Sequence, residues 1–209
     1  MSLIEEVRDT LVVGNAPKVA ELTEKALAEN VPVLEILNEG LVKGMDIVAE
    51  KWKNGEYYIP NVLIAARAMK HGMQIIKPKL VEDDYKAKAV AVAGTVKGDL
   101  HDIGKNLVVM MMEGAGFEVI DLGTDVSVEK FLQTAREKNA DLILMSALLT
   151  TTMMAMKDVI NTLKSSDLAD KVKTMVGGAP ITQKFADEIG ADGYAPDGSS
   201  AVECAKALL

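Results

Sequence analysis

The sequence predicts an α/β protein in which a four-helix bundle precedes a doubly wound parallel sheet. Over residues 1 to about 84, apolar residues recur at helical spacing and short polar turns separate the segments. From residue 88 on, short apolar runs that suit buried strands alternate with amphipathic segments, which is typical of a parallel sheet with crossover helices. The predicted domains are therefore 1–84 and 88–209.

Caps and prolines mark where the four bundle helices begin and end. Asn15 begins the second helix, because an Asn side chain accepts from backbone amides that have no partner in the first turn. Pro32 and Pro60 open the third and fourth helices, where a proline loses no hydrogen bond. Gly55 supplies the left-handed residue after the third helix, which is expected to run to about Lys53. Pro78 is expected to end the fourth helix.

After a polar hinge at 81–86, strands and helices alternate. The predicted strands are 88–94, 117–122, 141–146, 172–177 and about 192–195. The predicted helices are 103–114, 127–138, 152–164, 181–189 and 198–208. Because parallel strands end at the same edge of a sheet, the loops after them gather where open α/β folds bind ligands.

Composition and charge exclude several function classes. The chain has 209 residues, 49% of them hydrophobic, so a sizeable core is available. A net charge of −8 argues against a nucleic-acid binder, whose surface is usually basic. The sequence has neither a long apolar run nor a signal-peptide pattern, so we expect no membrane association and a cytoplasmic protein. The single cysteine, Cys204, excludes an intrachain disulfide.

The most informative segment is the glycine-rich loop 98–104, because it places one of only two histidines between two carboxylates. His101 follows Asp99 by two residues and directly precedes Asp102. A histidine can offer one ring nitrogen to a metal, while a nearby carboxylate holds the other nitrogen and fixes the tautomer. On residue types alone, a solvated or helix-capping cluster is the simpler alternative.

Nucleotide-binding loops fit this segment badly. A Walker loop needs Gly-x-x-x-x-Gly-Lys followed by a hydroxyl residue, but the interval from Gly98 to Gly104 is one residue too long and Asn106 replaces the hydroxyl. A dinucleotide fingerprint needs glycines closer together than Gly94 and Gly98.

The run Gly94-Thr95-Val96-Lys97-Gly98-Asp99-Leu100-His101-Asp102-Ile103-Gly104-Lys105-Asn106 resembles the signature loop of cobalamin-binding domains. The likeness is to the methyl-carrying type, found in methionine synthase and in the corrinoid proteins of methyltransferase systems. Further matches follow in the family's order. The run from Ser146 to Thr152 resembles its hydroxyl-rich turn, Gly177-Gly178 its glycine pair beside the cofactor tail, and Asp197-Gly198 lies near its last contact.

The resemblance implies a cobalamin or related cobamide, a Rossmann-like binding domain at 88–209 and a helical cap at 1–84. His101 would be the lower axial ligand of cobalt, Asp99 would stabilise the protonated ring, and Thr152 would complete a relay. Trp52 and Ile59 would belong to the cap over the upper face of the corrin. The other residues expected to contact the cofactor are Gly98, Asp102, Gly104, Ser146, Leu148, Thr150, Gly177, Gly178 and Gly198.

Simpler structural roles stay open for several of these residues. Thr152 has the position of a helix N-cap, and the hydroxyls of Ser146 and Thr150 suit ordinary turn hydrogen bonds. The pair at 177–178 could be a plain strand-ending turn, and Trp52 could simply pack between helices. Where methionine synthase has a Glu in the cap, this chain has Asn38, so that contact is not carried over.

The resemblance implies that the protein carries methyl groups and does not catalyse a reaction without its partners. Its partners would be a substrate-specific methyltransferase, an acceptor methyltransferase and a reductive activation protein. Methanol, methylamines, methoxylated aromatics and betaines all stay open as methyl donors. One alternative is the cobalamin subunit of an adenosylcobalamin-dependent mutase, although the helices at 1–84 count against it. Another is a cobalamin-based sensor, for which the chain has no length left.

Overall fold

The computed structural model describes residues 2–82 and 89–209. Contacts along the chain divide it into a helical unit, Met1–Lys86 with Gly114–Gly116, and a sheet unit, Ala87–Glu113 with Phe117–Leu209. Most of the expected hinge at 81–86 lies outside the described residues, as do the expected domain ends at 84 and 88. The first two hinge residues, Val81 and Glu82, continue the last helix of the helical unit.

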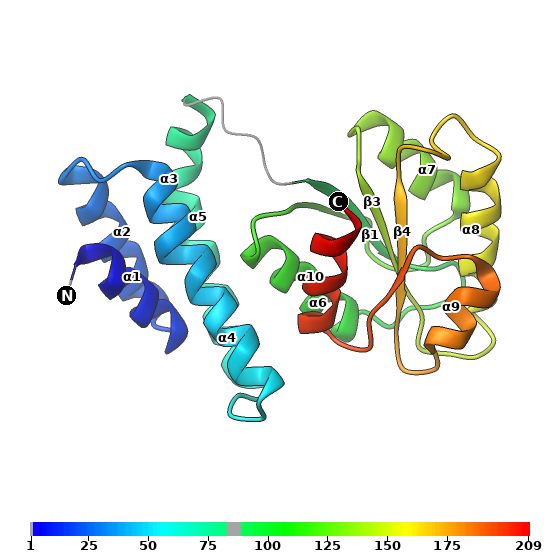
Figure 1. Ribbon diagram of the computed structural model, residues 1–209, viewed down its shortest axis with the longest axis horizontal. Coiled ribbons are helices and arrows are strands. Elements are labelled where there is room, and N and C mark those ends of the chain that lie inside the picture. Colours follow the sequence, from blue (N-terminus) through cyan, green and yellow to red (C-terminus); the bar gives the residue numbers. More distant parts are fainter. Residues whose placement is uncertain (1, 83–88) are drawn as a thin grey trace. The chain divides into compact units, whose positions relative to one another are not determined.

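The helical unit consists of four helical segments (Figure 1). They are α1 (Leu3–Val12), α2 (Ala16–Ala28), a continuous segment of α3 (Val33–Glu35), η1 (Ile36–Val42) and α4 (Lys43–Lys53), and α5 (Ile59–Glu82). Asn15 begins α2 as expected, since its Oδ1 accepts from the Lys18 amide at 3.3 Å. Buried apolar residues that face one another across the four segments form the core; they include Val7, Leu11, Val19, Ile36, Leu41, Val62 and Ile76.

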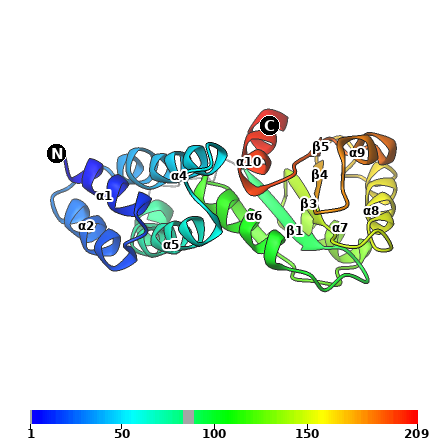
Figure 2. The same ribbon diagram turned by 90° about the horizontal axis from the view of Figure 1, so that it is seen from below.

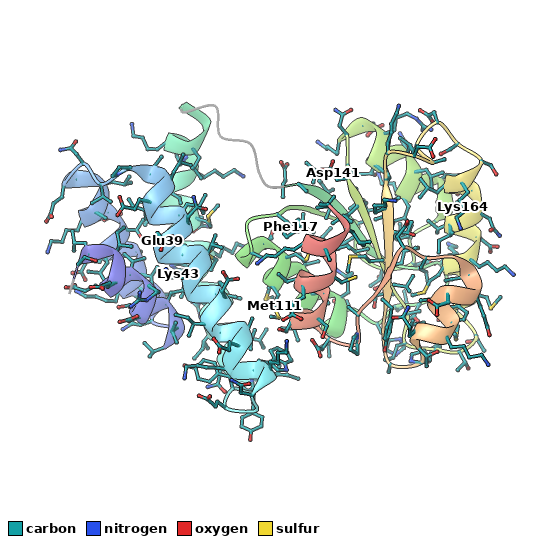
Figure 3. All side chains as sticks on the ribbon, in the orientation of Figure 1. Glu39, Lys43, Met111, Phe117, Asp141 and Lys164 are labelled. Carbon is teal, nitrogen blue, oxygen red and sulfur yellow. The ribbon has the colours of Figure 1, made fainter. Side chains whose placement is uncertain are left out.

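Two features of the helical unit differ from the expectation. Pro78 does not end the fourth helix, because α5 continues through it to Glu82. The φ angle of proline is itself helical, and the buried Leu80 continues the apolar face beyond it. The third helix also contains a π-helical stretch, η1, which the apolar spacing does not mark. Glu39 and Lys43, labelled in Figure 3, form an ion pair at 2.7 Å on the exposed face where this stretch ends.

The sheet unit contains five parallel strands in the order β2-β1-β3-β4-β5. Their bounds are β1 (Val90–Thr95), β2 (Glu118–Asp121), β3 (Leu142–Ser146), β4 (Lys173–Gly177) and β5 (Gly193–Tyr194). The central strands β1 and β3 are almost wholly buried, as expected of parallel strands covered on both faces. Asp141, labelled in Figure 3, aligns their starts by accepting a hydrogen bond from the Val90 amide at 2.8 Å.

Five helices cover this sheet: α6 (Ile103–Gly114), α7 (Val128–Glu137), α8 (Met154–Lys164), α9 (Gln183–Ile189) and α10 (Gly198–Leu208). In Figures 1 and 2, α6 and α10 cover one face, and α7, α8 and α9 cover the other. The predicted doubly wound α/β fold is thereby confirmed, with helix starts shifted by no more than two residues. No helix in the described residues is both long enough and apolar enough to cross a membrane.

The strand order indicates where on the sheet a ligand is expected to bind. Strands β1 and β3 are neighbours, and Thr95 pairs with Ser146 at their carboxyl ends. The chain leaves β1 toward β2 on one side and leaves β3 toward β4 on the other. Open sheets of this order bind ligands where the chain direction reverses in this way. The loops 96–102 and 147–153 both begin at that point.

Candidate functional site

The site is built around the contact between Asp99 and His101 in the loop after β1. His101 Nδ1 lies 2.7 Å from Asp99 Oδ1, and the His101 amide donates to the same oxygen at 3.1 Å. Asp99 is fully buried, whereas the His101 side chain is 50% exposed. Because the carboxylate accepts, we assign the ring proton to Nδ1, which leaves the lone pair on Nε2. His101 can therefore offer Nε2 to a metal in a fixed orientation.

The second oxygen of Asp99 ties this loop to the loop after β3. Asp99 Oδ2 accepts from the Leu148 amide at 2.8 Å, the Leu149 amide at 3.3 Å and Thr152 Oγ1 at 2.6 Å. Burial alone would raise the pKa of Asp99, but the hydrogen bonds from Thr152, Leu148 and His101 outweigh burial and hold that pKa well below its ordinary value. Asp99 is thus an anion at neutral pH, suited to stabilise a protonated His101 ring.

Thr152 is a partner of Asp99 and not the N-cap of α8. The N-cap position of α8 is Met153, which makes no side-chain capping hydrogen bond. The Thr152 hydroxyl lies in the preceding turn, also within 3.0 Å of Leu149 O. The carboxylate is the stronger acceptor for its proton, because it is charged. The hydrogen bonds expected between His101, Asp99 and Thr152 are therefore present, while their effect on a cofactor stays a prediction.

Replacing Thr152 by valine is expected to lower the free energy of unfolding by about 1–2 kcal/mol at pH 7, because a buried charge loses one donor. The loss raises the folded-state pKa of Asp99 toward its unfolded value. A depressed carboxyl pKa stabilises the folded protein above the unfolded-state pKa, and this stabilisation is lost as the pH falls through the folded-state pKa. The difference in stability between wild type and Thr152→Val should therefore shrink below about pH 4. Urea unfolding across this pH range measures it. Thr150→Val, an exposed hydroxyl in the same turn, is the control; equal losses in both variants would contradict the assignment.

Both loops of the site carry exposed apolar side chains, which we call the apolar rim. Leu100 is 73% exposed and Ile103 is 80% exposed, on either side of His101 in the chain. From the other loop, Leu148 and Leu149 expose their side chains while their amides bond to Asp99. Next to Ile103, a Cβ added at Gly104 would meet no atom within 4 Å. An exposed apolar rim of this kind typifies a ligand site and suits a flat, largely apolar macrocycle.

The loop 96–99 is held from the segment that follows β2. Asp125 has φ +55°, a conformation that Asp tolerates better than most residues. Its carboxylate accepts from the Gly98 amide at 2.8 Å and from Lys97 Nζ at 3.1 Å, and its own amide donates to Asp99 O at 3.0 Å. The Gly98 amide and Lys97 also lower the pKa of Asp125. Gly98 itself has φ +83°, which favours glycine there whatever binds nearby.

Contacts within the protein explain the glycine pair after β4. Gly178 has φ +126°, and a Cβ there would overlap the carbonyl oxygen of Ala147. A Cβ at Gly177 would stand 2.8 Å from Ala195 O, and one at Gly198 would stand 2.6 Å from Met111 Sδ on α6. Close backbone and helix packing therefore explains these glycines, and their contact with a ligand stays a prediction.

The remaining predicted residues differ in where they lie. Ser146 ends β3 and is half-buried, whereas Thr150 is exposed in the turn that follows. Asp102 is exposed and accepts from Asn106 Nδ2 at 3.1 Å, near the start of α6. Trp52, half-buried in the last turn of α4, and Ile59, 50% exposed at the start of α5, belong to the helical unit. Their contact with a corrin stays a prediction.

A buried cation beside the loop, Lys105, was not predicted from the sequence. The Lys105 side chain is 4% exposed, and its Nζ lies 2.5 Å from Asp121 Oδ2 and 2.7 Å from Asn106 Oδ1. A signal was available, since Lys105 precedes the buried Val109 and Met112 by four and seven residues and so shares their helix face.

Comparison with known proteins identifies the family of both units. Family models described as B12 binding domains match residues 89–203 and residues 3–77. The chain is 47% identical to dimethylamine corrinoid protein 3 of Methanosarcina acetivorans over 207 residues, which cover 99% of this chain and 97% of that protein. It is 45% identical to a corrinoid protein of Desulfitobacterium hafniense over 212 residues, which cover 100% of this chain and 98% of that protein.

A solved structure agrees with these relatives. A chain of the methanol:cobalamin methyltransferase complex MtaBC from Methanosarcina barkeri superposes with a TM-score of 0.89 and 29% identity, covering 99% of this chain and 79% of that one. One family model spans more than half of the chain, and both sequence relatives align with nearly all of it. The chain therefore belongs to the B12-binding corrinoid proteins, and its cofactor is a cobalamin-type corrinoid.

Proposed function

We propose that this protein carries a methyl group from a substrate-specific methyltransferase to a second, acceptor methyltransferase. The observation that carries the proposal is the half-exposed His101, whose Nδ1 is held at 2.7 Å by the buried Asp99 within an apolar rim. A bound corrinoid supplies a cobalt atom that accepts a methyl group and later gives it up. His101 Nε2 is the protein nitrogen that would hold this cobalt atom, because Nδ1 is engaged with Asp99.

His101 is suited to be a ligand that can also leave. While it ligates, Nε2 is unprotonated and Nδ1–H donates to Asp99. When it does not ligate, Nε2 is free to accept a proton, and the anionic Asp99 beside Nδ1 would stabilise the charged ring. The Leu148 and Leu149 amides and the Thr152 hydroxyl keep Asp99 ionised throughout. Asp99, its two backbone donors and Thr152 thus form a proton-linked support: they would stabilise the His101 ring both when Nε2 is a ligand and when it carries a proton.

The helical unit supports the proposal as a cover for the methyl group. Around the first turn of α5 it exposes Tyr58, Ile59 and Leu63, and the half-buried Trp52 ends α4 nearby in the chain. Apolar side chains of this size exclude water and oxygen from a reactive centre. We propose that Trp52 and Ile59 shield the upper face. A mutase would instead need that face open to its substrate.

A methylated amine is the proposed source of the methyl group. Its support is the 47% identity to a dimethylamine corrinoid protein over nearly the whole chain. Methanol, methoxylated aromatics and betaines are the alternatives that the test must separate. We also propose a reductive activation protein as a partner. Oxygen would oxidise the reduced cofactor between transfers, and a reductant would then be needed to restore it.

Reconstitution with separate methyltransferases tests the proposed function. The holoprotein is reduced and incubated with isotope-labelled dimethylamine, trimethylamine, methanol, a methoxylated aromatic or a betaine, each with its own methyltransferase. We expect label on the protein's cofactor with a methylated amine, and its onward transfer to a thiol when an acceptor methyltransferase is added. If label reached the cofactor only from a donor other than a methylated amine, the proposed substrate class would be wrong. Carbon-skeleton rearrangement with the adenosyl form of the cofactor and a barrel subunit would overturn the function.

Replacing Trp52 by alanine is expected to speed light-driven loss of the bound methyl group several-fold without abolishing cofactor binding, because the shield over it is reduced. Photolysis of the methylated holoprotein, followed by absorption, measures the rate. Trp52→Phe keeps an aromatic ring and should stay close to wild type. Equal rates in Trp52→Ala and wild type would mean that Trp52 only packs between helices.

A further inference from the structure

The first turn of α6 contains a charge that the proposed methyl transfer does not use. The Lys105 side chain is 4% exposed, and its Nζ lies 2.5 Å from Asp121 Oδ2 at the end of β2. Removing an ammonium from water is costly unless it is paired. The carboxylate of Asp121 provides that pair, and its Oδ1 accepts from the Gly123 amide at 2.9 Å, which fixes its own orientation. The ion pair therefore joins the start of α6 to a strand of the sheet.

From this ion pair, hydrogen bonds lead to the residue next to His101. Lys105 Nζ donates to Asn106 Oδ1 at 2.7 Å, which leaves Asn106 Nδ2 to donate to Asp102 Oδ2 at 3.1 Å. The Asn106 amide also donates to Asp102 O at 2.7 Å. Asp102 directly follows His101, so the network ends on the backbone of the loop.

The other side of this backbone is held by a different strand. Thr95 is fully buried in β1, and its Oγ1 donates to His101 O at 2.8 Å. His101 is thus fixed from β1 through Thr95 and from β2 through Asp121 and Lys105. The loop's conformation is set by the sheet before any ligand binds, which is how precise ligand positions are generally obtained.

We propose that Lys105 is a positioning residue for His101, acting through Asp121, Asn106 and Asp102. The ion pair fixes the first turn of α6 and thereby the direction in which His101 presents Nε2. This inference rests on the proposed role of His101 as the axial ligand. It assigns Lys105 no contact with the cofactor.

Lys105 could instead only stabilise the fold, and a double variant distinguishes that role from positioning of His101. Lys105 is the buried member of this ion pair, whereas the Asp121 side chain is 35% exposed. Removing Asp121 alone leaves the buried ammonium uncompensated, and replacing Lys105 as well removes that cost. Asp121→Asn should therefore lower the melting temperature, and Lys105→Met/Asp121→Asn should recover much of the loss. If Lys105 positions His101, the double variant will regain stability, but the hydrogen bond between His101 Nδ1 and Asp99 will stay weakened.

The histidine is observed directly in the apoprotein by nitrogen NMR after labelling of histidine. The chain has only two histidines, so His71, in α5 of the helical unit, is an internal reference. In Lys105→Met and in the double variant, we expect the Nδ1 proton of His101 to exchange with water about tenfold faster than in wild type, because its hydrogen bond to Asp99 is weakened. His71 should not change. Lys173→Met, which removes the more exposed Lys173–Asp192 ion pair at 3.4 Å in the same unit, is the control for loss of a lysine ion pair away from the loop.

Binding of hydroxocobalamin gives a second measurement on the holoprotein. We expect the dissociation constant of Lys105→Met to rise about tenfold and its spectrum to lose part of the histidine-ligated form. An unchanged Nδ1 exchange rate in Lys105→Met, with only a lower melting temperature, would overturn the inference. If instead the wild-type spectrum showed no histidine ligation, the proposed ligand would fail, and the apoprotein exchange rates would still decide whether Lys105 positions His101.

Discussion

Replacing His101 by alanine is expected to abolish the histidine-ligated absorption spectrum of the bound cobamide and to weaken its binding by at least about tenfold. The ring is half exposed, and Asp99 keeps its hydrogen bonds from Leu148 and Thr152 when the ring is gone. The carboxylate does lose the ring Nδ1–H as one donor, so the free energy of unfolding of the apoprotein should fall by about 1–2 kcal/mol, as for Thr152→Val. The apoprotein should stay folded, so a change in the spectrum reports on ligation.

The natural control for this substitution is the chain's other histidine. His71 lies in α5 of the helical unit, so His71→Ala should leave the spectrum of the holoprotein unchanged. Addition of free imidazole to His101→Ala should restore part of the ligated form, because the apolar rim of Leu100 and Ile103 remains. A wild-type spectrum in His101→Ala would remove this histidine from the cobalt site.

The sequence was sufficient for those parts of the fold and site that depend on neighbours along the chain. Buried strands and amphipathic helices alternate with different periods, so the five strands and five helices of the sheet unit were recognised. The contact between Asp99 and His101 was also predictable, because a spacing of two residues in a tight loop lets a carboxylate reach the ring. Local caps such as Asn15 were similarly visible.

The parts that depend on distant segments were not predictable from the local pattern, although the family resemblance implied the contact between Thr152 and Asp99. The amides of Leu148 and Leu149 reach Asp99 only because β3 lies beside β1, and nothing in the local pattern shows that pairing. The same is true of Lys105 and Asp121, whose pairing needs β2 on the other side of β1. In the helical unit, burial of Leu80 outweighed the helix-breaking tendency of Pro78, which is a tertiary effect on a local preference.

The glycines illustrate a further limit of sequence reasoning. A glycine indicates that something approaches the backbone closely, but not what approaches. At Gly177 and Gly178 the atoms that would collide with a Cβ are the carbonyl oxygens of Ala195 and Ala147. The same residues in a family motif can therefore serve the packing of the turn, the ligand, or both.

Replacing Asp99 by asparagine is expected to reverse the tautomer of His101. The asparagine has one acceptor and one donor end. Three donors, the Leu148 and Leu149 amides and the Thr152 hydroxyl, converge on the position of Oδ2, so the amide oxygen should face them. The NH2 group then faces the ring, and Nδ1 must accept. The ring proton moves to Nε2, which loses the lone pair needed for ligation.

The expected result is a 10- to 100-fold loss of cobamide affinity or of the ligated form, roughly the range for carboxylates that orient metal-binding histidines. Nitrogen NMR of the apoprotein identifies the tautomer, and the holoprotein spectrum reports ligation. Asp125→Asn is the matched control, because that carboxylate bonds to the Gly98 amide and Lys97 in the same loop region. If Asp99→Asn kept the Nδ1–H tautomer and full ligation, Asp99 would serve only to hold the two loops together, and the proton-linked support proposed for His101 would be wrong.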